Sequence, residues 1–377
     1  MGLRRGMVLG ALLAALAGIG LSGARDEFLI GWQGETYRPA DVWRGEQAKT
    51  LGGRQIEQAP ASEPWIETLS WRPRAFLYHS FMTDEECEHF IQLGAPQMKR
   101  SLVVSSSGDN GEVSDYRSSY GTFLNRMQDP ILTRVERRLS EWTHLPMINQ
   151  EDVQILRYGH GQNYKPHMDV LVVDDDDGRR QATVLVYLSD VEAGGETAFP
   201  NTRRHHWVDP GNVERMGKVS DCAAGHVAAK PKKGDALLFY SLKPNGAEDF
   251  MSEHTGCPVE NGTKWTATIW IHETAFRADA FYPPPPDWAP QDPGACVDFD
   301  ERCPALKDEG LCEADAINLK GDLVGDGALG VCRKTCGVCK DCAPDDRECY
   351  LKNRADSGYL NLDLQYLWPR PGSNRKA

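Results

Sequence analysis

The pattern of apolar and polar positions predicts two helices between residues 80 and 145. Thr83-Asp84-Glu85-Glu86 has the form of a capping box, and apolar residues follow it at helical spacing: Cys87, Phe90, Ile91 and Ala95. Asp129-Pro130 places an N-cap residue before a proline at the first helical position. The apolar face of this second helix carries Ile131, Leu132, Val135, Leu139 and Trp142.

From residue 150 the pattern changes to short β-rich runs, which are Val153–Tyr158, Thr183–Leu188, Ala236–Tyr240 and Trp265–His272. In the last run Trp265, Ala267, Ile269 and Ile271 alternate with Thr266, Thr268, Trp270 and His272, which is strand periodicity. Turns containing Gly, Asp or Pro separate the runs. The pattern therefore predicts a mainly β domain with flanking helices, built as a double-stranded β-helix (jelly roll) with the helices packed outside.

The segments on either side of this domain have a different character. Met1–Ala24 has the three-part form of a secretory signal, with a basic pair, an apolar run and small residues at its end. The apolar run is long enough that an uncleaved membrane anchor stays open as the alternative. Residues 25–70 are polar and Gly-rich, and we expect a stem or linker there. Tyr282–Pro286 predicts a stiff spacer, because four consecutive prolines cannot join a sheet.

Composition and charge narrow the class of partner. The chain has 377 residues, of which 40% are hydrophobic, so it can bury a real core. A formal net charge of −13 provides no broad basic surface, which argues against nucleic acid as a partner. On charge alone, a neutral or basic peptide fits better.

The cysteines indicate the redox compartment. Of 11 cysteines, all but Cys87, Cys222 and Cys257 lie in residues 296–349. Such density is more typical of disulfides formed in an oxidising compartment than of metal binding, and it agrees with a secretory signal.

The segment Tyr164–Asp169 carries candidate metal chemistry. His167 and Asp169 are two residues apart, which on a strand sends both side chains to the same face. His254 offers a third ligand after the strand Ala236–Tyr240. Two histidines and one carboxylate form the facial triad of non-haem Fe(II) oxygenases. A His-x-Asp pair alone is weak evidence, since most such pairs are surface accidents.

A lysine strengthens the case. Lys264 lies ten residues beyond His254, across Asn261-Gly262, a tight hairpin signal. On the next strand it would project into the barrel, where a buried cation needs an anionic partner. The distal carboxylate of 2-oxoglutarate would supply that partner. The alternative is an ordinary solvated lysine.

Several ordered motifs between Trp71 and Glu273 resemble the collagen-type and plant-type prolyl 4-hydroxylases. They are Gln154–Tyr158, Gly161–Tyr164, Thr183–Asp190, Gly194–Thr197, Lys230–Leu237 and Lys264-Trp265. The resemblance implies that His167, Asp169 and His254 bind Fe(II). It further implies that Lys264, Tyr158 and Thr197 hold 2-oxoglutarate, with O2 as cosubstrate and L-ascorbate as reductant. Tyr158 and Tyr164 could equally be core aromatics.

On the substrate side, the resemblance implies that a proline-containing polypeptide contacts Tyr164, Arg180, Arg117 and Ser119. Its proline would become 4-hydroxyproline while 2-oxoglutarate gives succinate and CO2. The family often has valine before the arginine matched by Arg117, where this chain has Tyr116.

The C-terminal cysteines resemble a ShK toxin-like (ShKT) domain. Six of them have the spacing C-x6-C-x8-C-x19-C-x3-C-x2-C. Spacing alone leaves 15 pairings open. The resemblance implies Cys296–Cys339, Cys303–Cys332 and Cys312–Cys336; zinc is the less favoured alternative.

The sequence leaves open whether the remaining cysteines form disulfides. Cys222 and Cys257 could form a disulfide that braces the His254 loop or stay as two buried thiols. Cys342 could pair with Cys349, which leaves Cys87 as the odd thiol.

Two polar features and a histidine pair could have functional roles, but an ordinary surface position explains each of them. The acidic run Asp174–Asp177 could bind calcium, but its charges lack alternate spacing and favour a solvated loop. Asn261-Gly262-Thr263 is formally a glycosylation acceptor, although its place in a turn argues against occupancy. His205 and His206 have no identifiable partner, and we expect them at the surface.

The expected organisation is a signal or anchor (1–24), a stem (25–70), a dioxygenase domain (71–280) with its metal-binding core at 150–273, a Pro-rich linker (281–295), a ShKT domain (296–339) and a C-terminal tail (340–377). We expect the protein in the lumen of the endoplasmic reticulum or Golgi as a type II membrane protein, or secreted if the signal is cleaved.

Two rival functions are a related dioxygenase acting on lysine and an inactive binding protein carrying the ShKT module. The second rival predicts a broken iron or cosubstrate set, whereas all four positions are intact.

Overall fold

A computed structural model describes residues 64–103, 112–113, 116–170, 178–209, 211–281, 290–322, 328–362 and 367. The expected signal, most of the stem, the acidic run Asp174–Asp177 and the spacer Tyr282–Pro286 lie outside these ranges. Within them, no helix is both long and apolar enough to cross a bilayer.

The strands are β1 (Trp65–Trp71), β2 (Arg74–His79), β3 (Lys99–Arg100), β4 (Leu102–Val103), β5 (Glu112–Val113), β6 (Tyr120–Leu124), β7 (Val153–Tyr158), β8 (Tyr164–His167), β9 (Arg180–Tyr187), β10 (Ala193–Gly194), β11 (Thr197–Phe199), β12 (Val227–Ala229), β13 (Ala236–Tyr240), β14 (His254–Gly256), β15 (Val259–Asn261) and β16 (Lys264–His272). The α-helices are α3 (Asp84–Gly94), α4 (Pro130–Thr143), α5 (Gly211–Met216), α6 (Cys303–Asp308), α7 (Leu311–Ala314), α8 (Ala316–Lys320) and α9 (Arg347–Asp356). The 3-10 turns are η1 (Ala95–Gln97), η2 (Met147–Asn149), η3 (Arg204–His206), η4 (Phe250–Ser252) and η5 (Ala278–Ala280).

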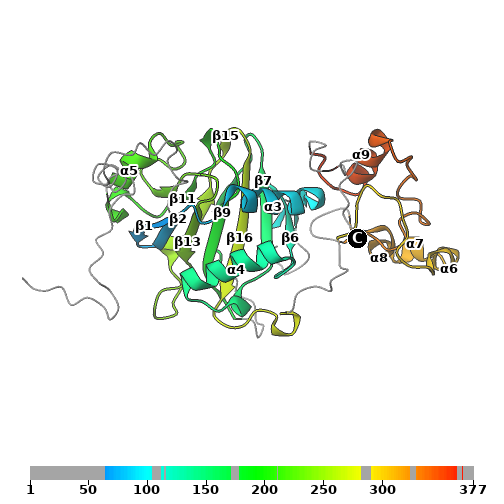
Figure 1. Ribbon diagram of the computed structural model, residues 1–377, viewed down its shortest axis with the longest axis horizontal. Coiled ribbons are helices and arrows are strands. Elements are labelled where there is room, and N and C mark those ends of the chain that lie inside the picture. Colours follow the sequence, from blue (N-terminus) through cyan, green and yellow to red (C-terminus); the bar gives the residue numbers. More distant parts are fainter. Residues whose placement is uncertain are drawn as a thin grey trace, which may run out of the picture. The chain divides into compact units, whose positions relative to one another are not determined.

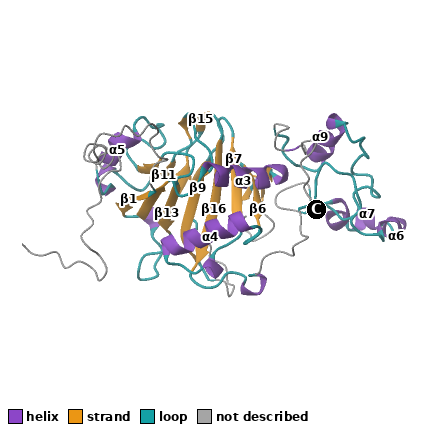
Figure 2. Cartoon of the chain, in the orientation of Figure 1, coloured by secondary structure: helices purple, strands orange, loops and turns teal. Residues whose placement is uncertain are grey.

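The largest sheet among the described residues is antiparallel and has the order β1-β2-β13-β9-β16-β7-β6-β3. Helices α3 and α4 lie across one face of it (Figure 1), and Figure 2 shows the two helices in front of the strands. Their apolar faces bury Phe90, Ile91, Leu132 and Leu139 against strand residues such as Ile269. Each such side chain contributes roughly 1.5–3 kcal/mol by leaving water, so this layer is the main core.

A second sheet, ordered β12-β11-β14-β8, packs on the other face of the large sheet. Phe199 on β11 meets Phe239 on β13 edge to face, with ring centroids 5.4 Å apart, in an apolar layer that also contains Leu69 and Tyr187. The architecture is thus the predicted one: mainly antiparallel β sheets with flanking helices.

Both predicted helix starts are confirmed. Thr83 and Glu86 form the reciprocal capping box of α3. The Asp129 carboxylate accepts hydrogen bonds from the backbone amides of Ile131 and Leu132, and Pro130 opens α4. Local side-chain chemistry therefore fixes where these helices begin.

Two local predictions differ from the structure. The sheet begins at Trp65, inside the expected stem, because β1 pairs with β2 and buries Leu69. The hairpin expected at Asn261-Gly262 is wrong: β15 pairs with β10, whereas β16 pairs with β7 and β9. Gly262 (φ 91°) makes a turn, but the turn carries the chain from one sheet to another.

Disulfides hold the C-terminal region. The bonds are Cys296–Cys339, Cys303–Cys332 and Cys312–Cys336, the three pairs that the resemblance implied, together with Cys342–Cys349. Within the expected tail, the described residues 340–362 include α9, which buries Asn353 and Arg354. The Asn353 side-chain amide donates to the backbone carbonyls of Gly294 and Lys340.

Candidate active site

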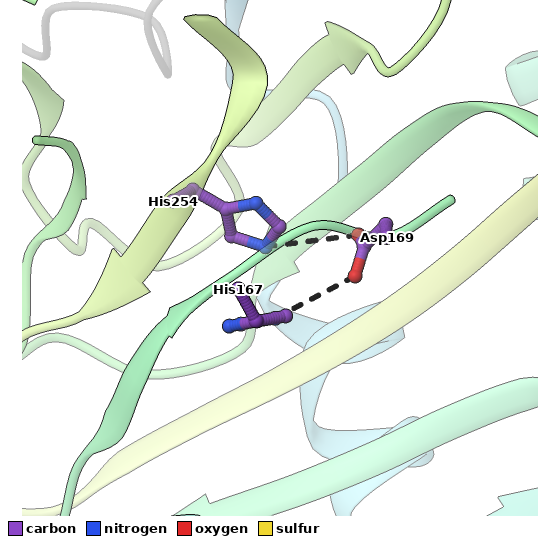
Figure 3. A group of neighbouring side chains, drawn as sticks. All are labelled: His167, Asp169 and His254. Carbon is purple, nitrogen blue, oxygen red and sulfur yellow. Dashed lines mark ion pairs between the residues drawn. The ribbon is translucent and has the colours of Figure 1, made fainter. Parts of the chain in front are cut away.

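Three side chains on or directly after strands of the second sheet converge on one point (Figure 3). His254 on β14 pairs in register with His167 at the end of β8, and Asp169 follows two residues later. Nε2 of His167 lies 3.5 Å from Oδ1 of Asp169, and Nε2 of His254 lies 3.6 Å from Oδ2. One ligand atom from each residue lies within 4.8 Å of the others. The donor set and spacing fit one Fe(II) ion held by two imidazoles and a carboxylate.

The backbone orients both imidazoles. Nδ1 of His167 lies 2.8 Å from the carbonyl oxygen of Lys165, and Nδ1 of His254 lies 3.1 Å from that of Ser252. Each Nδ1 therefore carries the proton and donates it to a carbonyl. The lone pair of each Nε2 is then left for a metal, as is usual for metal-binding histidines.

Thr183 on β9 fixes the carboxylate, and sequence analysis did not identify it as part of the site. Its hydroxyl donates a hydrogen bond of 2.7 Å to Oδ2 of Asp169. This bond leaves Oδ1 to face His167 and restricts rotation of the carboxylate. The signal was present in the sequence, because Thr183 opens an otherwise apolar run, but its partner is 14 residues away.

Burial and mutual charge shift the pKa values of the three groups. Burial and the neighbouring His167 lower the pKa of His254 to about 4. Burial alone would raise the pKa of Asp169, but His254 and His167 outweigh it and hold that pKa well below its usual range. His254 is thus held as a neutral imidazole and Asp169 as an anion, which are the states in which these groups bind a divalent cation.

His167, Asp169 and His254 line a cavity, and strand β16 presents a polar face to it. Lys264, Thr266, Thr268 and Trp270 line it, whereas the alternate residues of the strand, including Ala267 and Ile269, belong to the main core. All nine residues of β16 are buried. The polar half of the predicted alternation therefore lines this cavity and is buried with the rest of the strand.

Lys264 carries a buried amino group that no anion neutralises through an ion pair among the described residues. It is 3% exposed, and burial lowers its pKa to about 7 although Glu196 acts in the opposite direction. Nζ lies 5.5 Å from the ring centres of both Tyr158 and Tyr187. No residue in the described ranges forms a hydrogen bond or ion pair with it. An ammonium group in this position fits the distal carboxylate of 2-oxoglutarate.

The comparisons with known proteins agree with this geometry. Residues 153–272 match the model of the 2OG-Fe(II) oxygenase superfamily. The chain is 42% identical over 279 residues to Probable prolyl 4-hydroxylase 6 of Arabidopsis thaliana, covering 73% of this chain and 89% of that protein. The chain belongs to the prolyl 4-hydroxylase family. Prolyl 4-hydroxylase 2 of the same plant is 40% identical over 277 residues, covering 73% of this chain and 88% of its own.

Among solved structures, the viral collagen prolyl hydroxylase of Paramecium Bursaria Chlorella virus-1 in complex with 2OG is similar to this chain. The two are 26% identical, with a TM-score of 0.38, and the match covers 52% of this chain and 94% of the viral chain. Family membership implies Fe(II), 2-oxoglutarate and O2, and the residues described above fit the first two.

Tyr158 and Thr197, expected on the 2-oxoglutarate side, both line the cavity with Lys264. The Tyr187 hydroxyl donates a hydrogen bond of 2.9 Å to Oγ1 of Thr197. Burial raises the pKa of Tyr187, so this phenol stays protonated and keeps its role as donor. Sequence analysis missed Tyr187, since it reads as one more apolar position of a buried strand.

Of the four residues expected to contact peptide, Tyr164 and Arg117 line the cavity. The Tyr164 ring stacks on His167 with centroids 3.6 Å apart, and the Arg117 guanidinium lies 4.8 Å from the Tyr164 ring centre. Arg117 donates to Oε1 of Gln154 at 2.6 Å. Ser119, in contrast, is fully buried and donates to the Ser101 hydroxyl, so the structure does not bring it to the cavity wall.

Arg180 lies behind the cavity wall. Its guanidinium stacks 3.8 Å from the ring centre of Trp270, which does line the cavity. Two of its nitrogens also donate to the Glu151 carboxylate, which His272 contacts at 2.7 Å. Glu151, Trp270 and His272 were not identified as site residues from sequence, because their partners are brought together only by the fold.

The disulfide Cys222–Cys257 resolves the choice left open by sequence. Cys257 directly follows β14, three residues after His254. The Glu196 carboxylate accepts hydrogen bonds from the amide and hydroxyl of Ser220, which ties the partner segment to the Lys264 side of the cavity. Cys87 is the buried free thiol, and burial raises its pKa to about 12, so it is inert.

Proposed function

We propose that this chain hydroxylates C4 of prolyl residues in polypeptides, with Fe(II), 2-oxoglutarate and O2. One observation carries the proposal: His167, Asp169 and His254 converge, and the same cavity is lined by Lys264, whose ammonium has no hydrogen-bond or ion-pair partner among the described residues. The names of the relatives, prolyl 4-hydroxylases, supply the proline specificity.

His167, Asp169 and His254 would hold the iron, and Lys264 with Tyr158 and Thr197 would hold 2-oxoglutarate. When bound, the metal and cosubstrate would supply the oxidising chemistry, with succinate and CO2 as the products of 2-oxoglutarate. The chain supplies geometry. Thr183 holds the Asp169 carboxylate, backbone carbonyls hold both imidazoles, and burial at 6% or less exposure keeps Asp169, His254 and Lys264 away from bulk water.

We also propose the peripheral assignments. Tyr164 and Arg117 would contact the peptide directly, and Arg180 would act through Trp270. Ascorbate would keep the iron reduced. Five disulfides support a site of action in the oxidising secretory pathway. The six-cysteine module would be a ShKT domain, as its spacing and pairing support.

The test is a turnover assay in air with the full chain, Fe(II), 2-oxoglutarate, ascorbate and a proline-rich peptide that also contains lysine. We expect succinate and 4-hydroxyproline in equal amounts by mass spectrometry. Hydroxylated lysine beside unmodified proline would support the related lysine enzyme instead, and iron binding without succinate would support the inactive binding protein. Asp169→Ala and His254→Ala should each abolish iron binding and turnover but preserve the fold.

A further inference from the structure

A groove of about 660 Å³ lies on the surface beside η4, outside the metal cavity. The end of β1, the start of β2, the turn η3 and the loop 243–245 contribute to its walls. We call it the basic groove and define it by Trp71, Arg72, Arg74, His206, Lys243 and Phe250. Nothing in the proposed chemistry uses these residues.

The exposed charge in the groove is positive. Arg72 and Lys243 are exposed, and neither side chain has an ion-pair partner in the part of the chain that the structure describes. Asp249 is an acid on the wall, but it is 7% exposed and its carboxylate accepts the backbone amide of Met251. A chain with a net charge of −13 thus gathers unpaired cations here, and an anionic ligand fits.

Two aromatic rings accompany these cations. Trp71 is 61% exposed and Phe250 is 67% exposed, and both are large for open surface positions. Trp71 is steadied by an edge-to-face contact with Phe76 at 5.5 Å, and Asn201 donates to the carbonyl of Phe250 at 2.9 Å. Exposed aromatic faces on a firm wall are typical of surfaces that bind extended proline-rich segments.

The groove adjoins the metal site through η4. Met251 lines the groove and precedes the iron ligand His254 by three residues, so the two Cα atoms are at most about 11 Å apart. The Ser252 hydroxyl also contacts the sulfur of Met168 at 4.0 Å. Met168 lies between the other two iron ligands, His167 and Asp169, in the sequence. A polyproline II chain advances about 3.1 Å per residue, so roughly three or four residues span this distance.

We propose that the basic groove binds an acidic, proline-rich segment of the polypeptide substrate, a few residues from the proline that enters the metal cavity. This inference rests on the proposed function and adds a substrate class to it. Carboxylates would meet Arg72, Arg74 and Lys243, while proline rings would meet Trp71 and Phe250. The net charge of the whole chain pointed to a neutral or basic peptide, but the local charge of the groove reverses that expectation for the flanking sequence.

The experiment compares peptides that share one proline-rich core and differ in a six-residue flank on both sides. The flanks are Glu-Pro, Gln-Pro or Glu-Ala repeats, and hydroxyproline in the core is measured by mass spectrometry. We expect the Glu-Pro flank to lower KM about tenfold relative to either other flank, with kcat unchanged. The advantage over Gln-Pro should vanish at about 0.5 M salt, where charges are screened within a few ångströms.

Charge reversal provides the decisive variant. Arg72→Glu combined with Lys243→Glu should remove the preference for Glu-Pro flanks and create one for Lys-Pro flanks, since both side chains project from the surface. Trp71→Ala should raise KM for the Glu-Pro peptide and leave that for Glu-Ala unchanged. Lys232→Glu is the matched control, because Lys232 is exposed and outside the groove, and it should leave every KM unchanged.

The outcomes separate the two proposals. Equal KM for all flanks, with the core hydroxylated, overturns the groove and leaves the hydroxylase function standing. Equal benefit from Glu-Ala and Glu-Pro shows a simple polyanion site and also overturns it. If no peptide is hydroxylated, the function fails, and anisotropy of a labelled Glu-Pro peptide still tests the groove: binding that charge reversal weakens supports it, and no binding overturns it.

Discussion

The oxygenase domain and the C-terminal cysteine module are stabilised in different ways. In the domain, α3, α4 and the large sheet bury 23 apolar residues in one cluster. The buried cluster of the module contains only four residues, and three are disulfide-bonded cysteines: Cys303, Cys312 and Cys332. The domain can therefore place polar groups such as Thr266 in its interior at the active site, whereas the module depends on covalent bonds.

Buried polar groups also have different roles in the two regions. In the module, Arg333 is fully buried and donates to the carbonyls of Ala295 and Pro293 and to the Ser357 hydroxyl, so it joins separate segments. In the domain, Lys264 is almost as buried but has no such partner in the described ranges. A buried cation that donates to several protein acceptors has a structural role, whereas one that donates to none is evidence of a ligand.

The largest expected effect tests that distinction. Lys264→Ala should raise KM for 2-oxoglutarate about 100-fold or more, because a desolvated ammonium-carboxylate pair is worth several kcal/mol. Thermal unfolding should change little, since no hydrogen bond or ion pair between the ammonium and the described residues is lost. Lys232→Ala serves as the exposed control. A fall in melting temperature with unchanged KM would make Lys264 a structural residue like Arg333.

The second effect concerns the cross-links of the module. Replacing Cys303 and Cys332 by alanine should destabilise the module by about 3.6 kcal/mol on the chain-entropy model and leave the melting of the oxygenase domain unchanged. The control pair is Cys342–Cys349, whose sequence separation is 7 instead of 29, so its loss should cost about 1 kcal/mol less. Limited proteolysis followed by mass spectrometry distinguishes the regions, and early cleavage within the domain would contradict the comparison.

Much of this division could be predicted from sequence. The capping residues Thr83 and Asp129 fixed helix starts, because caps act within three residues. The cysteine spacing resembled a known module, and the structure has the pairing which that resemblance implied. In each case the relevant information is local or carried by a family pattern.

What the sequence did not show depends on contacts between distant segments. Thr183 and Tyr187 lie in a buried strand, and only the fold directs their hydroxyls to Asp169 and Thr197. The turn at Asn261-Gly262 was recognised, yet the sheet that each flanking strand joins was not. A turn signal specifies backbone angles, whereas strand partners are chosen by long-range packing.

Thr183 provides the third prediction. Thr183→Val keeps the shape of the side chain but removes the hydrogen bond to Asp169, so we expect 10- to 100-fold weaker iron binding, about the usual cost of losing such a partner. Calorimetric titration under anaerobic conditions measures it. Thr122→Val on β6 is the control, because Thr122 is not among the cavity residues. Equal iron affinity in both variants would show that the carboxylate needs no positioning.

The smallest expected effect lies in the core behind α4. Glu136 is 2% exposed, its carboxylate accepts the backbone amide of Met127 at 3.0 Å, and burial raises its pKa to about 7. Because this pKa exceeds the ordinary value of 4.5, ionisation of Glu136 destabilises the folded state progressively between pH 4.5 and 7, and fully above pH 7.

Glu136→Gln should therefore raise the free energy of unfolding at pH 8 by about 1 kcal/mol, a gain of roughly 2–4 °C in Tm for a domain of this size. The relation between pKa and stability allows a gain of up to about 3 kcal/mol in the free energy of unfolding. An amide oxygen accepts a weaker hydrogen bond from the Met127 amide than a carboxylate does, and this loss offsets part of the gain. The gain should shrink as the pH falls towards 5, where the wild-type carboxyl is protonated. Glu141→Gln on the exposed side of α4 is the control and should show no pH-dependent gain. A gain from Glu136→Gln that is equal at both pH values would mean that packing, and not ionisation, limits stability at this position.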